Sequence, residues 1–233
     1  MYRSASWLLF FTSAVGAEEV GLQLVLLADA TGSISEPEIR FQREGYAAAL
    51  TNSLVLSAID ATATGSIALI YVEWAEGTEV IVDWTKIDGP DSAANFAEAL
   101  LSSPRRASGR NAIGTALLAG KSLIEGNEFS SIRAVIDFSG DSSVSYAGPP
   151  LKSARAEVLG AGITINGLPI NCYFCDALHD FPEIEAEYEE LIIGGPGAFV
   201  LAASNEDDLV ETIRRKLILE ISGNVPISSI AQR

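Results

Sequence analysis

The sequence has little positive charge and few residues that bind soft metals. Lys and Arg number 15 against 31 Asp and Glu, which gives a formal net charge of -16 at pH 7, and there are two cysteines and one histidine. Phosphate backbones and anionic lipid surfaces repel so acidic a chain, whereas cations are attracted to it. The composition therefore argues against nucleic acid as a partner.

The sequence also lacks an apolar run long enough to cross a bilayer. Near the N-terminus, Arg3 is followed by the apolar residues 7–11 and by small residues up to Ala17. A membrane-spanning helix needs about 20 apolar residues, and this stretch is much shorter. Its pattern is that of a signal peptide. We therefore expect residues 1–17 to be removed, leaving a periplasmic or secreted protein with no membrane span in the mature chain.

No internal repeat, low-complexity linker or break in composition divides the rest of the chain. The length of 233 residues fits one domain and a short leader. Hydrophobic residues make up 48% of the sequence and charged residues 20%, which is typical of a globular protein. We expect one domain over residues 18–222 and a C-terminal tail over residues 223–233.

Segments typical of strands alternate with segments typical of helices. The expected strands are 20–28, 66–74, 79–84, 134–138, 163–170 and 198–202. The expected helices are 36–59, 91–101, 113–124, 150–159, 182–191 and 205–221. Glu76-Gly77 lies between two of the strands and predicts a hairpin turn. The order predicts an α/β fold: an open, mostly parallel twisted sheet of about six strands, with helices on both faces and one antiparallel edge strand.

Polar residues that follow buried strands are the candidate metal ligands. Asp29, Thr31 and Ser33 follow the first strand at alternate positions, Asp141 lies just beyond the strand 134–138, and Asn111 precedes a helix between them. Ligands of open α/β sheets gather at the carboxyl ends of the strands. Carboxylate, hydroxyl and amide oxygens are hard ligands. They favour Mg²⁺, with Mn²⁺ or Ca²⁺ as alternatives.

These residues carry a family resemblance. The segment Asp29-Ala30-Thr31-Gly32-Ser33 resembles the Asp-x-Ser-x-Ser signature of the von Willebrand factor A fold, which marks its metal-ion-dependent adhesion site. In that family a Thr from a later loop and an Asp at the end of the fourth strand complete the coordination. Asn111 and Asp141 occupy the matching positions.

The resemblance extends from about residue 20 to residue 222 and is closest to an uncharacterised bacterial family of exported proteins with this domain. The segments that carry it are 45–47 (Gly-Tyr-Ala), 71–74 (Tyr-Val-Glu-Trp), 136–141 (Ile-Asp-Phe-Ser-Gly-Asp), 165–170 (Ile-Asn-Gly-Leu-Pro-Ile), 194–199 (Gly-Gly-Pro-Gly-Ala-Phe) and 215–217 (Arg-Lys-Leu). The resemblance implies a binding module and not an enzyme. Its metal would contact an Asp or Glu carboxylate of a protein partner.

Two positions depart from the family pattern. Thr31 in place of Ser keeps the hydroxyl, so coordination is expected to survive. Asn111 in place of Thr has a longer side chain and places its oxygen elsewhere unless the loop adjusts. A metal-free scaffold of the same fold, which binds through its loops alone, is therefore an alternative.

A second alternative is an esterase of the GDSL type. Gly140-Asp141-Ser142 resembles the nucleophile block of those enzymes, and Asp176-Ala177-Leu178-His179 resembles their Asp-x-x-His block, so Ser142 and His179 would be catalytic. In those enzymes the nucleophile block follows the first strand, whereas here it lies in the second half of the chain. The blocks that build the oxyanion hole are not evident.

Cys172 and Cys175 are the two cysteines, three residues apart in a chain expected to be exported. They are a candidate disulfide. A zinc site formed by this pair and His179 would lack a fourth ligand.

Overall fold

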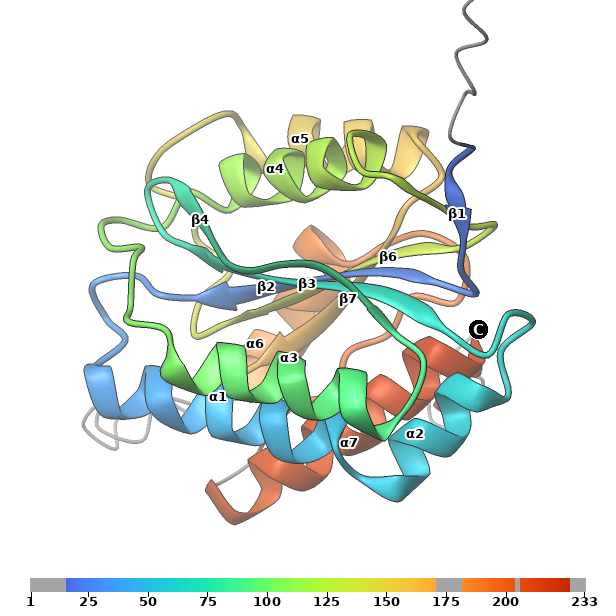
Figure 1. Cartoon of the computed structure of the whole chain (residues 1–233). Coiled ribbons are helices and arrows are strands. Elements are labelled where there is room, and N and C mark those ends of the chain that lie inside the picture. The colour runs from blue at the N-terminus through green and yellow to red at the C-terminus, as the bar shows by residue number, and fades with distance from the viewer. Residues whose placement is uncertain (1–15, 171–181, 204–205, 227–233) are drawn as a thin grey trace, which may run out of the picture.

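The computed structural model describes residues 16–170, 182–203 and 206–226 (Figure 1). In chain order, its elements are β1 (Glu18–Glu19), β2 (Gln23–Asp29), α1 (Glu36–Leu50), α2 (Ser53–Asp60), β3 (Ile67–Trp74), β4 (Thr78–Ile87), α3 (Pro90–Ser102), α4 (Ile113–Glu125), β5 (Phe129–Ser130), β6 (Ala134–Gly140), α5 (Leu151–Gly160), β7 (Thr164–Pro169), α6 (Pro182–Glu187), the π-helix η1 (Tyr188–Ile192) and α7 (Glu206–Ser222).

Five strands form the main sheet in the order β4-β3-β2-β6-β7. β2 pairs in parallel with β3 on one side and with β6 on the other, and β6 pairs in parallel with β7. β4 lies at the edge, antiparallel to β3, because the two strands form the hairpin that Glu76-Gly77 predicts. This arrangement confirms the mostly parallel sheet with one antiparallel edge strand.

The sixth expected strand, 198–202, is not a regular strand. Gly167 of β7 donates its N–H to the Phe199 carbonyl and accepts a hydrogen bond from the Leu201 N–H. The next step of this parallel ladder would need an N–H from Pro169, which has none. The segment therefore meets β7 only through isolated bridges.

The expected single helix over 36–59 is wrong, because the chain forms two helices there. α1 begins with a capping box in which the Ser35 hydroxyl and the Glu38 carboxylate each accept a backbone hydrogen bond. The Asn52 side chain accepts a hydrogen bond from Leu54 N at 2.9 Å and so caps a new helix, α2. Asn favours such a cap over a helix interior.

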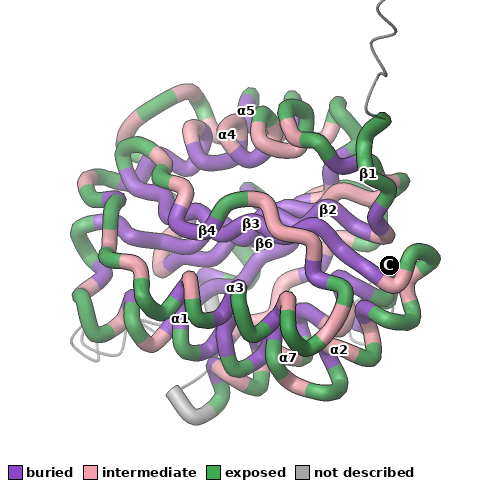
Figure 2. Tube along the Cα trace, in the orientation of Figure 1, coloured by how far each residue is buried: buried purple, intermediate pink, exposed green. Residues whose placement is uncertain are grey.

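Helices cover both faces of the sheet, as the alternation of elements predicts. α4 and α5 lie over one face, and α1, α2, α3 and α7 lie over the other (Figure 1). Alternate residues of β2 supply the two cores: Leu24 and Leu26 pack on the side of α1 and α7, whereas Val25 and Leu27 pack on the side of α4. The buried sheet between its two helical layers is visible in Figure 2.

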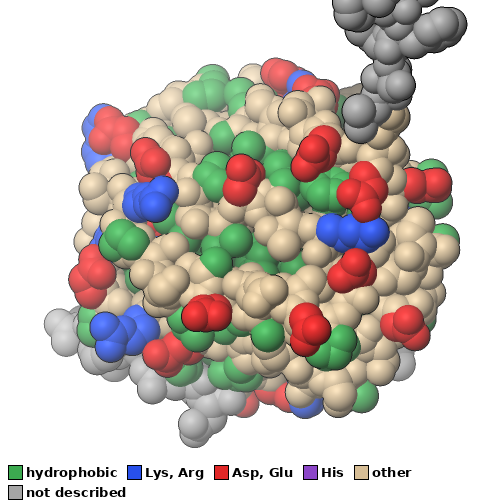
Figure 3. All heavy atoms as spheres, viewed as in Figure 1, with side chains coloured by type: hydrophobic (Ala, Val, Ile, Leu, Met, Phe, Trp, Pro, Cys, Tyr) green, Lys and Arg blue, Asp and Glu red, His purple; other side chains and the backbone are tan. Residues whose placement is uncertain are grey.

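The surface is acidic, as the composition requires. Acidic side chains are scattered over the face drawn in Figure 3 and exceed the basic ones there. In the described part of the chain, every helix is too short or too polar to cross a bilayer.

Candidate metal centre

The candidate ligands lie where the order of the sheet reverses. β2 is followed in the chain by β3 on one side of it, whereas β6 lies on its other side and leads on to β7. Such a switch point, at the carboxyl ends of the strands, is the usual ligand site of an open α/β sheet. Asp29 ends β2 and Asp141 follows β6, and the Asp141 N–H lies 3.4 Å from Asp29 Oδ2.

The loop after β2 turns its side chains toward this point. Thr31 N donates to Asp29 Oδ1 at 2.8 Å, which folds the loop back on the carboxylate. Thr31 Oγ1 and Ser33 Oγ are 3.0 Å apart. Asp29 and Thr31 are buried, Asp141 is half-buried and Ser33 is exposed. The four side chains therefore lie at increasing exposure, from the buried end of β2 to the protein surface.

Among the described residues, no cationic side chain compensates the two carboxylates. In the described part of the chain, none of the ion pairs involves Asp29 or Asp141. Burial, together with the charge of Asp141, raises the pKa of Asp29 to about 7. Burial also raises the pKa of Asp141; a hydrogen bond from Ser33 opposes this rise, and the charge of Glu38 adds to it. A buried carboxylate pair of this kind must take up a proton or a cation.

The donor set fits a hard divalent cation. Two carboxylates and two hydroxyls supply oxygen ligands alone, which is the chemistry that Mg²⁺, Mn²⁺ and Ca²⁺ accept. Among the described residues, no group of three or more Asp, Glu, His or Cys side chains is arranged to hold a metal. A metal held by Asp29 and Asp141 would therefore depend on the hydroxyls of Thr31 and Ser33 as well.

Asn111 differs from the other four predicted ligands. Its loop touches the β2 loop, because Gly32 N donates to the Gly109 carbonyl at 2.9 Å. The Asn111 carbonyl accepts hydrogen bonds from Tyr146 N at 2.7 Å and Ala147 N at 3.1 Å. In the part of the chain that the structure describes, the Asn111 amide forms no hydrogen bond with the other four side chains. The structure thus brings four of the five predicted ligands together and places Asn111 in the adjoining loop.

Two aromatic side chains that the sequence did not mark as part of the site hold the turn before Asp141. Trp74 Nε1 donates to the Ser139 carbonyl and the Tyr188 hydroxyl donates to the Gly140 carbonyl, each at 2.9 Å. A Cβ on Gly140 would lie 2.8 Å from Asp29 Oδ2, so this close approach requires glycine. Tyr188 comes from η1, far along the chain, and no local pattern marks it.

The esterase, disulfide and zinc interpretations depend on residues that the structure does not describe. Cys172, Cys175 and His179 lie outside the described residues. Ser142 is described, and its hydroxyl accepts a hydrogen bond from Val144 N at 3.0 Å within its own loop.

Solved structures with the same fold include von Willebrand factor A proteins. A von Willebrand factor type A protein from Catenulispora acidiphila is 17% identical with a TM-score of 0.61, over 88% of this chain and 43% of that one. Proximal thread matrix protein 1 from the mussel byssus, with a zinc-occupied MIDAS (metal-ion-dependent adhesion site) motif, is 18% identical with a TM-score of 0.58, over 88% and 49%. The pilus adhesin SpaC from Lactobacillus rhamnosus GG is 13% identical with a TM-score of 0.60, over 89% and 32%.

At these identities the comparison shows the fold alone, and this chain spans half or less of each of those three proteins. A search of the curated proteins gives no match. The model of a family described as "Protein of unknown function (DUF1194)" matches residues 19–225, most of the chain. The chain therefore belongs to the DUF1194 family of proteins of unknown function, and its fold is that of the von Willebrand factor A domain.

Proposed function

We propose that this protein is an exported binding module that recognises a protein partner through a divalent cation. Asp29, Thr31, Ser33 and Asp141 would hold the cation, with Mg²⁺ favoured and Mn²⁺ or Ca²⁺ as alternatives, and Asn111 would contribute from its neighbouring loop. The partner would offer an Asp or Glu carboxylate. Binding, and not catalysis, is the role proposed for the site.

One observation carries the proposal: Asp29 and Asp141 lie together at the switch point of the sheet, next to two hydroxyls, and no cationic side chain of the described residues balances them. Elsewhere in the fold, buried carboxylates have such a partner, as the Arg43–Glu73 pair does. The structural neighbours include an adhesin and a protein with a metal-occupied motif, which supports a binding role.

The arrangement explains why a carboxylate is the expected partner group. Two carboxylates and two neutral hydroxyls only just balance the charge of a divalent ion, so the ion would keep its attraction for a further anion. Thr31 is buried and Ser33 is exposed, which leaves the solvent side of the loop open to a partner. The protein surface is acidic, so a free acidic peptide without the cation would be repelled.

Export belongs to the same proposal. It rests on the signal-peptide pattern of residues 1–17, and a disulfide between Cys172 and Cys175 would suit an oxidising compartment. Expression of the full chain in a bacterium, followed by fractionation and N-terminal sequencing, tests it. We expect periplasmic or secreted protein that begins at Glu18, and retention of residues 1–17 on cytoplasmic protein would contradict export.

A pull-down from an extract of exported proteins tests partner recognition. The bait is the mature chain, with Mg²⁺ or with chelator, and Asp141→Asn is the matched control because it keeps the shape of the side chain and removes its charge. We expect partners that are retained with Mg²⁺ and lost both with chelator and with Asp141→Asn. Partners that are indifferent to both changes would contradict metal-bridged recognition.

The metal-free scaffold remains the second candidate because the Asn111 amide is not bonded to the other four side chains. Asn111→Thr restores the residue that the fold usually has at this position. A large gain in Mg²⁺ affinity over the wild type would favour the scaffold, since it would mean that this chain has lost most of its site. Similar affinities for the two proteins would favour the metal-bridged module.

A further inference from the structure

We propose that Arg105 is a positioning residue for the loop Asp29–Ser33, which it holds through backbone carbonyls so that the Thr31 and Ser33 hydroxyls are presented to a cation. The inference rests on the proposed function, because it concerns how the metal ligands are kept in place. Arg105 lies in the irregular segment between α3 and α4, where no sequence motif connects it with the site.

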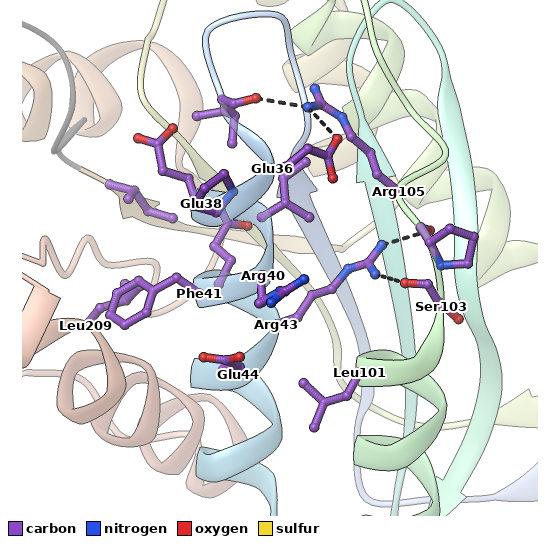
Figure 4. Close-up of a pocket in the computed structure, with 16 residues that line it drawn as sticks. Glu36, Glu38, Arg40, Phe41, Arg43, Glu44, Leu101, Ser103, Arg105 and Leu209 are labelled. Carbon is purple, nitrogen blue, oxygen red and sulfur yellow. Dashed lines mark hydrogen bonds and ion pairs between the residues drawn. The ribbon is translucent and has the colours of Figure 1, made fainter.

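The Arg105 guanidinium makes a dense set of contacts with this loop and the start of α1. Nη2 donates to the Ala30 carbonyl at 2.5 Å and to the Thr31 carbonyl at 2.9 Å, and Nη1 donates to the Ile34 carbonyl at 3.0 Å. Nη1 also lies 3.3 Å from the Glu36 carboxylate. Figure 4 shows Arg105 reaching toward the N-terminal end of α1, with Glu36 beside it.

A guanidinium suits this task because its five N–H donors lie in one rigid plane. Three carbonyls of one short loop are fixed at once, so the loop cannot rotate its peptide planes freely. The Thr31 N–H then remains directed at Asp29, and the Ser33 hydroxyl remains next to Thr31 Oγ1. In the described part of the chain Arg105 forms no ion pair with Asp29 or Asp141, so it acts on the ligands through the backbone.

A buried ion pair fixes the segment from which Arg105 reaches. The Arg43 guanidinium of α1 contacts the Glu73 carboxylate of β3 at 2.5 Å, and both side chains are almost fully buried. Glu73 Oε2 accepts hydrogen bonds from the backbone N–H groups of Arg106, at 2.9 Å, and Ala107, at 3.2 Å. Arg43 donates to carbonyls at the start of the same segment, those of Ser103 and Pro104. Arg105 therefore acts from a base anchored to both β3 and α1.

If Arg105 acts only through its charge, its replacement should change the cation affinity in the opposite direction from that expected for a positioning residue. Removing a positive charge near a cation site raises cation affinity through electrostatics alone, because a repulsion is lost. Losing the hydrogen bonds to the loop lowers cation affinity, because the hydroxyl ligands are no longer held in place. The sign of the change in affinity therefore separates the two roles.

The test is calorimetric titration of the mature protein with Mg²⁺ and Mn²⁺, for the wild type and three variants. We expect Arg105→Gln to weaken binding about 10- to 100-fold, the usual effect of losing a group that orients metal ligands. Arg105→Lys keeps the charge but replaces the rigid planar fork of the guanidinium with a single ammonium nitrogen on a flexible stem, so we expect an intermediate loss. Arg106→Gln is the matched control, because that side chain is exposed and its substitution keeps the backbone N–H that bonds to Glu73. It should leave affinity unchanged or slightly higher.

Urea unfolding of each variant in chelator establishes that the folded state persists. Equal or tighter metal binding by folded Arg105→Gln would overturn the positioning role while leaving the proposed function standing. A wild type that binds neither metal would overturn both. If Arg105→Gln does not fold, Arg105→Lys decides: weakened binding supports the role of Arg105, and wild-type affinity overturns it.

Discussion

Two groups of carboxylates lie close to the central strands β2 and β6, and they differ in whether a described basic side chain pairs with them. Asp29 and Asp141, the strand-end pair, form no ion pair with a basic side chain in the described part of the chain, and Asp141 is partly exposed to solvent. The second group, the α7 cluster, consists of Asp137 of β6 with Lys216 and Glu220 of α7. Lys216 Nζ contacts Asp137 Oδ1 at 2.6 Å and Glu220 Oε1 at 2.5 Å. The difference separates a group of charges paired within the fold from one for which we propose a bound cation.

Three further side chains contact the α7 cluster. Asn166 Nδ2 donates to Glu220 Oε1 at 2.9 Å, and the Tyr46 hydroxyl lies 3.4 Å from Asp137 Oδ2. Lys216 also lies 5.7 Å from the centre of the Phe199 ring. Burial, with the charge of Asp137, still raises the pKa of Glu220 to about 7, because one lysine faces two carboxylates.

Removing the lysine should have the largest effect. Lys216→Met leaves two buried carboxylates without a cation, and breaking a buried pair in this way costs about 3 to 5 kcal/mol. Urea unfolding measures the loss. Arg215→Met, on the exposed side of the same helix, should change stability by about 0.5 kcal/mol or less. Equal losses of stability for the two variants would contradict the stabilising role of Lys216 in the α7 cluster, and with it the contrast with the strand-end pair.

Neutralising one carboxylate in each group should give different results. Asp137→Asn weakens a charge-assisted contact with Lys216, and we expect a loss of about 1.5 to 3 kcal/mol in the free energy of unfolding. Asp29→Asn removes an uncompensated buried charge, so in chelator we expect no loss or a gain. A loss for Asp29→Asn as large as that for Asp137→Asn, measured in chelator, would contradict the contrast.

A methyl group added next to the strand-end pair should lower both the stability of the fold and the Mg²⁺ affinity of the site. The Cβ of Gly140→Ala would lie 2.8 Å from Asp29 Oδ2 and 2.9 Å from Trp74 Cζ2. Overpacking of this kind costs about 1 to 3 kcal/mol, and we expect weaker Mg²⁺ binding as the carboxylate is displaced. Gly160→Ala is the control, since nothing lies within 4 Å of its added Cβ. Wild-type stability and Mg²⁺ affinity in Gly140→Ala would contradict the close packing.

The last comparison concerns the pH dependence of stability. The pKa of Glu220 is raised from 4.5 to about 7 in the folded protein, so the folded state holds this proton more tightly than the unfolded state does. The stabilisation that results is complete below pH 4.5 and is lost as the pH rises through 7. The stability of Glu220→Gln relative to wild type should therefore rise across this range, as measured by urea unfolding at several pH values. A constant difference would count against the shifted pKa.

Much of the fold could be predicted from local patterns. Buried apolar runs predicted the central strands of the main sheet, and the Glu76-Gly77 turn predicted the antiparallel edge strand β4. The break between α1 and α2 was missed because apolar residues lie on both sides of the short polar stretch 51–53, where the Asn52 cap starts the new helix. The prediction of a sixth strand was wrong for a reason outside its own sequence: Pro169 in the neighbouring strand β7 has no N–H to donate.

The candidate site could be predicted only in part. Asp29, Thr31, Ser33 and Asp141 follow buried strands, so the topology of the sheet alone brings them together. Arg105 and Tyr188 could not be found in this way. Arg105 lies 74 positions from the Thr31 carbonyl that it binds, and an arginine in an irregular segment is ordinarily a surface residue. Such supporting contacts depend on tertiary packing and leave no local pattern.

Calorimetric titration of the mature wild-type protein with Mg²⁺, beside Asp29→Asn, tests the central claim most directly. The strand-end pair lacks the cation that the α7 cluster has, so we expect one Mg²⁺ to bind per wild-type chain and no measurable binding to the folded variant. Two results would contradict the account: wild-type protein that binds none of Mg²⁺, Mn²⁺ and Ca²⁺, or an Asp29→Asn variant that binds Mg²⁺ as tightly as the wild type does.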